Sequence, residues 1–376
     1  MDYLILNDRF SLNSHDYLLK TTADSREKRI ELNLFRQGEL IYTSHSGYNP
    51  TVSERRRKQL TAQYHRRHRD ELIKLSQLHR QRDQQNLAIE TNYLLAGGFL
   101  KYGMVQEAIA LLQDLVKNHE CNSRVQATLG QAYLRLQQYD LAGAAFDHAR
   151  LTHPDFADLH FYSGVCEYHQ RHCAAAVHEF ARALEINPYY GEAYFYLGLA
   201  LLLNARLGQE YELAKDLDER ATKALSTAQA ILPTLRGETF TQGMKFLEQK
   251  KFEEAHDLLK PLTEHISSAK PDVINHEFHL EVLHEAEHIR PEQVWQEIAR
   301  LRSLAQRYPN YADIYYELGF AYAVLGVSVT SKATANFEKA LQINPAYDGA
   351  KKSLKLIRYD QRGFRTMLQA MLPRPC

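Results

Sequence analysis

Residues 129–155 read LGQAYLRLQQYDLAGAAFDHARLTHPD, and residues 163–189 read SGVCEYHQRHCAAAVHEFARALEINPY. The two stretches carry small, aromatic and proline residues at matching places, 34 positions apart. The matching pairs are Gly130 and Gly164, Ala142 and Ala176, Phe146 and Phe180, Ala149 and Ala183, and Pro154 and Pro188. A constant period of this length predicts a stack of similar helical hairpins rather than one closed core.

The residue types explain why paired helices fit this period. Gly130 and Ala142 are small, so two helices can cross closely there, and Phe146 fills the space beside the crossing. Pro154 cannot continue a helix and therefore ends one hairpin before the next begins. Each hairpin then buries its apolar side only against its neighbours, so a long chain can fold without one large core.

This pattern resembles the tetratricopeptide repeat family over about residues 89–360. The resemblance implies a mainly α-helical fold, a right-handed α-solenoid of helix-turn-helix repeats. We predict about seven repeats over residues 89–347; the fourth has an insertion near 204–218 and the sixth, about 270–309, is degenerate. Residues 348–376 are predicted to form a C-terminal capping helix and a tail, because the last repeat of a solenoid needs a cover for its apolar edge.

The N-terminal residues 1–50 do not repeat and predict a small β-containing region. Residues 29–35 and 39–45 alternate apolar and polar side chains, and Gly38 between them suits a hairpin turn. Residues 3–7 are a candidate third strand. A two-stranded hairpin is marginal alone, so we expect this sheet to dock on the repeats or on a partner.

Residues 51–88 predict a basic amphipathic helix, capped by Ser53 and carrying an irregular apolar stripe of Leu60, Tyr64, Leu72, Leu75 and Leu78. Three interpretations stay open: a solvated helix packed on the first repeat, an electrostatic site for nucleic acid, anionic lipid or an acidic partner, or a coiled-coil dimerisation helix. The cations that define it include Arg55, Arg56, Arg57, Arg66, Arg67 and Arg69.

Composition narrows the class of protein. The 46 Lys and Arg residues balance 46 Asp and Glu residues, so no overall basic field indicates nucleic acid. The four cysteines form no CxxC pair and no disulfide framework. The N-terminus lacks the basic lead of a secretory signal, and no run of 18 apolar residues predicts a membrane span. We expect a cytoplasmic protein.

One enzyme-like string is present, HEAEH at residues 284–288. His284 and His288 are weak metal candidates with Glu285 as base, because residues four apart share a helix face. A catalytic zinc needs a third protein ligand, and Val294 stands where one zinc-protease continuation requires histidine. No phosphate-binding glycine loop or nucleophile elbow occurs either. We therefore predict no enzyme, no cofactor and no dedicated metal site, and keep a zinc hydrolase as a remote alternative.

The resemblance also implies where a partner binds, because in this family the first helix of each pair lines the concave groove. An alternative for each groove residue is that it packs between helices. The asparagine positions of the family's clamp for acidic tails hold other residues, among them Val165 and Leu199, so that mode is disfavoured. The predicted groove residues are Tyr93, Arg124, Gln131, Phe161, Tyr168, Phe195, Phe240, Tyr316 and Phe320.

The function predicted from these observations is a non-enzymatic protein–protein interaction scaffold or adaptor. Its partner would be a peptide or helix of another protein, seated in the groove by apolar anchors. The alternative is binding of nucleic acid or an anionic surface through the basic helix, which the balanced net charge disfavours.

Overall fold

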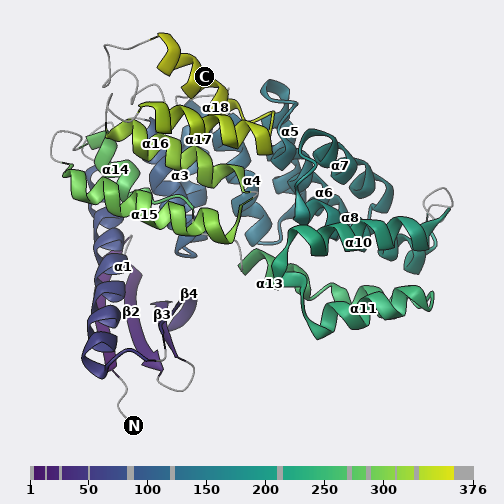
Figure 1. The fold of residues 1–376 in the computed structure, drawn as a ribbon, viewed down its shortest axis with the longest axis horizontal. Coiled ribbons are helices and arrows are strands. Elements are labelled where there is room, and N and C mark those ends of the chain that lie inside the picture. Colours follow the sequence, from purple (N-terminus) through teal and green to yellow (C-terminus); the bar gives the residue numbers. More distant parts are fainter. Residues whose placement is uncertain are drawn as a thin grey trace. The chain divides into compact units, whose positions relative to one another are not determined.

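The computed structural model describes residues 4–12, 15–24, 28–49, 51–82, 89–118, 123–209, 215–268, 273–284, 289–309, 311–325 and 330–359 (Figure 1). It divides into two compact units. The first contains Met1–Leu115 with His276–Glu281, and the second contains Val116–Asn275 with Val282–Cys376. The first unit therefore contains the N-terminal sheet together with most of the first predicted repeat, and the predicted domain bounds stay a prediction.

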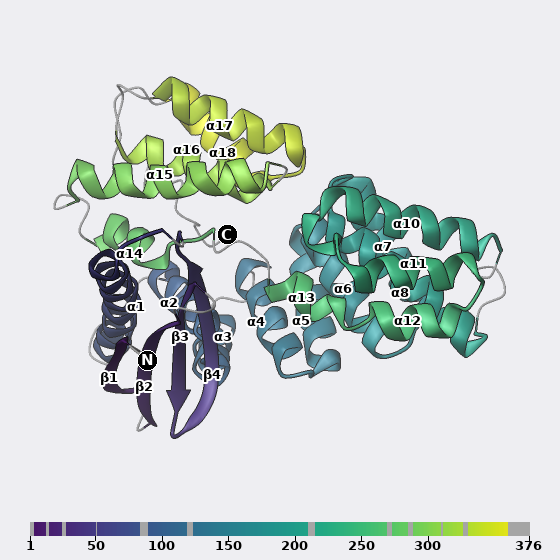
Figure 2. The ribbon, with the colours of Figure 1, turned by 60° about the horizontal axis from the view of Figure 1, so that its bottom comes forward.

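The described strands form one antiparallel sheet in the first unit, in the order β1-β2-β3-β4 (Figure 2). Its strands are β1 (Leu4–Leu12), β2 (His15–Asp24), β3 (Arg29–Arg36) and β4 (Glu39–Gly47). The predicted hairpin is β3–β4, and Gln37 and Gly38 turn it with φ of 50° and 91°. Residues 3–7 fall largely within β1 as predicted, whereas β2 was not predicted.

The basic helix is α1 (Glu54–Arg82), and it packs on β1, β2 and the next helix, α2 (Ile89–Lys101). Ser53 Oγ accepts the Arg56 N–H at 3.3 Å, which confirms the predicted cap. Of the predicted apolar stripe, Leu72 and Leu75 are buried, whereas Leu60, Tyr64 and Leu78 are half-buried. The buried line of α1 recurs at spacings of three and four and is largely polar: Thr61, His65, His68, Leu72, Leu75 and His79.

The first repeat, α2 and α3 (Val105–Asn118), is tightly joined to this sheet and helix. A Cβ at Gly98 would lie 2.7 Å from Leu75 of α1. Gly103, with φ of 71°, lies against β4, where a Cβ would meet the Ile41 carbonyl oxygen at 2.1 Å. These close approaches confirm that the sheet docks on the chain's own repeats and that α1 packs on the first of them.

The second unit begins with three regular repeats (Figure 1). A Cβ at Gly130 would lie 2.6 Å from the Phe146 ring, and one at Gly164 would lie 2.7 Å from Phe180. Gly198 approaches Leu225 in the same way. The crossings predicted from the 34-residue period are therefore confirmed. The repeats are α4 (Ser123–Arg135) with α5 (Tyr139–Thr152), α6 (Ala157–His169) with α7 (Cys173–Ile186), and α8 (Gly191–Leu207) with α10 (Leu217–Ile231).

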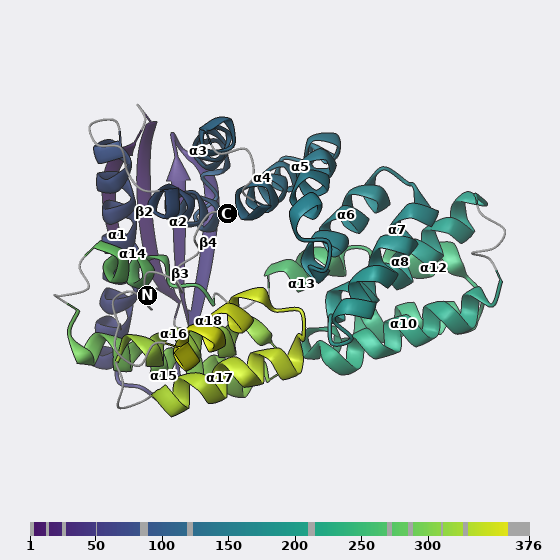
Figure 3. The same cartoon turned by 90° about the horizontal axis from the view of Figure 1, so that it is seen from above.

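The stacking changes at the fifth repeat, α11 (Glu238–Glu248) and α12 (Phe252–Leu259), which follows the short 3-10 turn η1 (Pro233–Leu235). In the regular repeats, the second helix packs on the next first helix: α5 on α6, and α7 on α8. At the fifth repeat α10 and α11 touch only briefly, and α12 packs along α8 instead (Figure 3).

Six helices follow in the described residues: α13 (Leu262–Ser268), α14 (His276–His284), α15 (Pro291–Arg307), α16 (Ala312–Val324), α17 (Thr330–Ile343) and α18 (Asp348–Tyr359). One pair of them, α16 with α17, returns to the repeat pattern. Gly319 of α16 crosses Phe337 of α17 as Gly130 crosses Phe146. The helix predicted after the last repeat is α18, and it packs on α17. The fold is thus a mainly helical repeat array with a small N-terminal sheet, as predicted. In the described residues no helix is long and apolar enough to cross a membrane.

Candidate functional site

Six of the nine predicted groove residues are buried, so the prediction of an exposed aromatic stripe is wrong at these positions. They are Phe161, Tyr168, Phe195, Phe240, Tyr316 and Phe320, each 9% exposed or less. The physical reason is that the rings pack on one another. Phe161 lies 4.8 Å from Tyr190 between ring centroids, and Tyr316 lies 5.3 Å from Tyr347.

The other three predicted residues are half-buried: Tyr93, Arg124 and Gln131. Tyr93 belongs to α2 in the first compact unit, and Arg124 and Gln131 belong to α4 in the second. The structure therefore brings together only part of the predicted set. Phe161 and Tyr168 of α6, Phe195 of α8 and Phe240 of α11 share one buried cluster. Whether any of the nine residues binds a partner stays a prediction.

The inner face of α6 and α8 is covered by the chain's own helix α12. His256 of α12 lies with its Nε2 2.8 Å from the Tyr168 hydroxyl of α6, and both side chains are buried. Leu259 of α12 and Leu199 of α8 are fully buried in the same cluster. We call this covered surface the α6–α8 inner face.

An ion-pair group fixes the edge of this contact. Arg206 lies in the last turn of α8, with its Nη1 2.5 Å from Asp257 Oδ1 and its Nε 3.2 Å from Glu253 Oε1. The helix α8 has 17 residues against 13 in α6, and it ends at Gly208 with φ of 61°. The predicted insertion thus lengthens α8, and the added turn supplies Arg206.

Burial controls the protonation of the groups under α12. It lowers the pKa of His256, although Asp257 acts in the opposite direction. Burial also raises the pKa of Tyr168 well above its ordinary value. A neutral His256 whose Nδ1–H points to Asp257 accepts the Tyr168 O–H at Nε2, because Nδ1 lies 3.3 Å from Asp257 Oδ1. Burial therefore favours the neutral form of His256 while α12 is docked.

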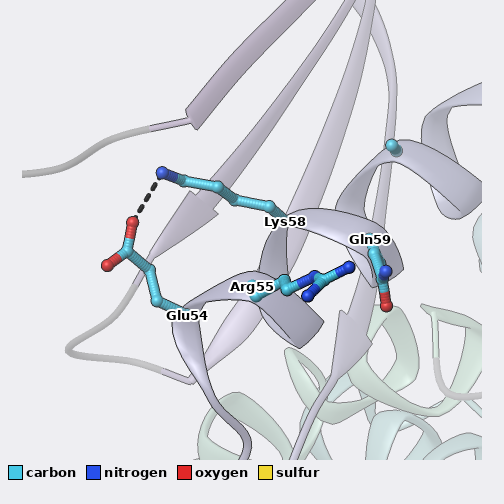
Figure 4. A pocket seen from close by; sticks show the side chains of 5 residues that line it. Glu54, Arg55, Lys58 and Gln59 are labelled. Carbon is cyan, nitrogen blue, oxygen red and sulfur yellow. Dashed lines mark ion pairs between the residues drawn. The ribbon is translucent and has the colours of Figure 1, made fainter.

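The basic helix presents one cationic side. Arg55, Arg56, Arg66 and Arg67 are exposed, and Arg57 is half-buried. A surface hollow at the start of α1 is lined by Glu54, Arg55, Lys58, Gln59 and Ala62 (Figure 4). All five lining residues belong to α1, so the hollow is formed by one helix. Within it, Lys58 Nζ pairs with Glu54 Oε1 at 2.5 Å.

Arg69 differs from the other arginines of the basic helix, because acidic neighbours partly neutralise it. Its Nη2 lies 2.8 Å from Asp70 Oδ1, and its Nη1 lies 3.9 Å from Asp8 Oδ2. The hydrogen bond with Asp70 raises the pKa of Arg69. Of the six predicted cations, four are therefore fully available at the surface and two are partly engaged or covered.

A polar network lies beneath α1 and was not predicted. His65 Nε2 lies 2.8 Å from Asp8 Oδ2, and its Nδ1 lies 2.8 Å from Thr21 Oγ1. The hydroxyl of Thr21 is no accessible nucleophile, because that residue is fully buried. The histidines at positions 65, 68 and 79 follow the helical spacing of Leu72 and Leu75, a signal that an apolar scale does not weigh.

The metal prediction falls largely outside the described residues. Glu285 and His288 are not described, and of His284 only the helical backbone is. Within the described ranges, no cluster of three or more His, Cys, Asp or Glu side chains is placed to hold a metal ion. Cys166 and Cys173 are free and buried, and burial raises the pKa of Cys166 to about 12, which suits a packing role.

These features define a helical repeat protein. Comparison with known protein families identifies the type of repeat in part of the chain. Residues 127–190, from α4 to the end of the third repeat, match the family model described as Tetratricopeptide repeat. Tetratricopeptide repeat protein 37 of Xenopus laevis is 34% identical over 94 residues, 25% of this chain and 6% of that protein. The chain therefore spans only a small part of that relative. The family match confirms the tetratricopeptide repeats predicted from the sequence over residues 127–190.

Two solved structures are similar in part. MamA of Desulfovibrio magneticus RS-1, from residue 41 to its end, is 18% identical and aligns over 49% of this chain and 99% of that one, with a TM-score of 0.37. YrrB, described as a TPR protein with an unusual peptide-binding site, is 15% identical and aligns over 70% of this chain and 90% of that one, with a TM-score of 0.31.

Proposed function

We propose that this protein is a non-enzymatic scaffold that binds a helical segment of another protein on the α6–α8 inner face. One observation carries the proposal: that face already holds a helix, α12, through apolar packing, one buried hydrogen bond and two ion pairs. Amphipathic helices bind protein grooves through these same contacts. Tetratricopeptide repeats, confirmed here, are typical protein-binding modules, which supports the same class of function.

The experiment uses charge reversal on and off this face. Arg206→Glu opposes acidic residues at the edge of the face, whereas Arg182→Glu reverses an exposed arginine on α7 that pairs only locally with Glu185. Affinity capture from cells that express the protein, followed by mass spectrometry, compares both variants with the wild type. We expect Arg206→Glu to lose a partner that Arg182→Glu retains. Equal recovery by both variants would contradict this binding surface.

A second candidate function rests on α1. Arg55, Arg56, Arg66 and Arg67 are exposed along one helix, which favours an anionic ligand. Reversing all four to glutamate is expected to abolish binding to duplex DNA or to anionic vesicles, and wild-type binding should fall steeply with salt because phosphate contacts release counterions. Titration of the wild type into labelled DNA at low salt tests this, and no association with DNA or vesicles there excludes it.

A further inference from the structure

We infer that α12 occupies, in the free protein, the seat of the partner helix, and that the partner is an acidic amphipathic helix with the residue pattern of α12. The inference deepens the proposed function and rests on it. The α12 sequence FEEAHDLL places Ala255, His256 and Leu259 on the buried side, with Glu253 and Asp257 beside Arg206. The polar part of this pattern has counterparts on the α6–α8 inner face: Tyr168 contacts His256, and Arg206 contacts both carboxylates.

The contacts of α12 differ from those of the second helices in the regular repeats. In the regular array α5 packs on α6 and α7 packs on α8, so each second helix stays between successive first helices. The fifth repeat breaks this order, because its second helix, α12, reaches α8 and extends to Tyr168 of α6. In an array that continued regularly, α11 would pack along α10 as α6 packs along α5 and α8 along α7.

The polar atoms of the face specify the chemistry of its occupant. Tyr168 is 3% exposed, so its hydroxyl needs an acceptor from the bound helix, and His256 supplies one. Arg206 contacts two carboxylates four residues apart, a spacing that places both on one side of a helix. A partner helix therefore needs an acidic pair at i and i+4, with a hydrogen-bond acceptor on the adjacent side.

The attachment of α12 allows displacement. It has eight residues, too few to be stable as an isolated helix, so its helicity depends on its packing. Leu259 packs directly on Gly243 of α11, where a Cβ would lie 2.5 Å away. This contact joins α12 to α11, whereas its hydrogen bond and ion pairs join it to α6 and α8. Because α12 belongs to the same chain, its effective concentration at the α6–α8 inner face is on the order of millimolar. A free helix that binds this face weakly therefore cannot displace α12.

The test weakens the docking of α12 and leaves the α6–α8 inner face unchanged. In the full chain, Glu253→Arg with Asp257→Arg sets two cations against Arg206, which remains unchanged. Adding Arg206→Glu to this variant restores opposite charges and serves as the rescue. A matched control, Glu254→Arg with Glu264→Arg, reverses two exposed acids for which the structure shows no contact with Arg206. The probe is a labelled peptide of residues 250–261, KKFEEAHDLLKP.

Two measurements are made on each protein: hydrogen exchange over residues 252–259, and peptide affinity by fluorescence anisotropy. We expect the release variant to exchange faster in α12 and to bind the peptide at least about tenfold more tightly than the wild type, since an intramolecular competitor has been removed. The rescue variant and the matched control should behave as the wild type does. A peptide with arginine at positions 253 and 257 should not bind the release variant.

Three results would overturn the inference. The first is slow exchange of α12 in the release variant, which would mean that the ion pairs do not hold it. The second is an opened α12 without peptide binding. The third is a concentration-dependent dimer of the release variant by light scattering, which would make a second copy the occupant. Failure of the proposed function alone would give a different result. The peptide would bind the α6–α8 inner face of the release variant, but no cellular partner would be lost in Arg206→Glu.

Discussion

The core beneath α1 and the core of the regular repeats are built in opposite ways. In the repeats, glycines face phenylalanine or leucine side chains across the crossings, as Gly164 faces Phe180 and Gly198 faces Leu225, and fully buried alanines line the second helices. Beneath α1, histidine, threonine, glutamate and tyrosine side chains hydrogen-bond to one another. The comparison teaches that shape specifies the repeats, whereas the N-terminal unit adds buried polar pairs to the leucine core of its sheet.

The largest expected effect breaks the shape-based core. Phe180→Ala should lower the free energy of unfolding by about 3 to 5 kcal/mol, because it leaves a cavity beside Gly164 that the helices cannot close. Urea denaturation followed by circular dichroism measures it. The control Arg182→Ala, on the exposed side of the same helix, should change stability by less than about 0.5 kcal/mol. A similar loss in both variants would contradict a core specified by shape.

A smaller effect tests the buried ion pair of the N-terminal unit. Lys101 Nζ lies 3.0 Å from Glu71 Oε1, and the Glu71 side chain is 2% exposed. Glu71→Gln should cost about 3 kcal/mol by removing the charge opposite a buried lysine. Denaturant unfolding also tests Glu71→Leu with Lys101→Met, which should recover most of this loss because no buried charge remains. Failure to recover would show that the pair itself stabilises the core.

The next effect concerns one hydrogen bond beneath α1. Thr21→Val keeps the shape of the side chain but removes the hydroxyl that contacts His65, so it should cost about 1 to 2 kcal/mol. The adjacent Thr22→Val is the matched control, since Thr22 lies half-buried on the other face of β2 and should change stability little. Thermal unfolding of the two variants distinguishes them, and equal melting temperatures would remove the role given to His65.

The smallest effect is the pH dependence of α12 docking. Burial lowers the pKa of His256 below its ordinary value of 6.5. Protonation of His256 therefore favours the undocked state of α12. The contribution of neutral His256 to the stability of docking is fully present above pH 6.5 and declines as the pH falls below that value. The groups that face His256 are Tyr168 of α6, Arg206 of α8, and Asp257 and Lys260 of α12. Hydrogen exchange of α12 should be faster at pH 5.5 than at pH 7.5, after correction for intrinsic rates, and this difference should vanish in His256→Gln.

The regular repeats were predictable because their residues act locally. Gly130, Ala142 and Phe146 meet across one hairpin, and the same contact recurs at a fixed interval. The helix at 54–82 and the β3–β4 hairpin were predictable from charge pattern and alternation. The strand β2 was missed because Leu18 and Leu19 interrupt its alternation, and because its inward positions include Thr21 and Ala23, which are weakly apolar.

The candidate site was only partly predictable. The sequence placed Phe161, Tyr168 and Phe195 on the first helices, and the structure has them there. The exposure of these side chains depends on the helix that packs against them. That helix is α12, which lies more than fifty residues after Phe195 in the sequence. No local pattern reports such a contact, because either helix of the fifth repeat has an apolar side that suits α8.

The sequence by itself determined the repeat, since small residues at a constant interval permit helices to cross only at those points. It also determined the charges that α1 shows to solvent. Only the tertiary structure decided that the α6–α8 inner face is covered and that the buried line of α1 is largely polar. Both outcomes depend on contacts between residues distant in the chain, where the burial of a group is decided by its neighbours rather than by its own type.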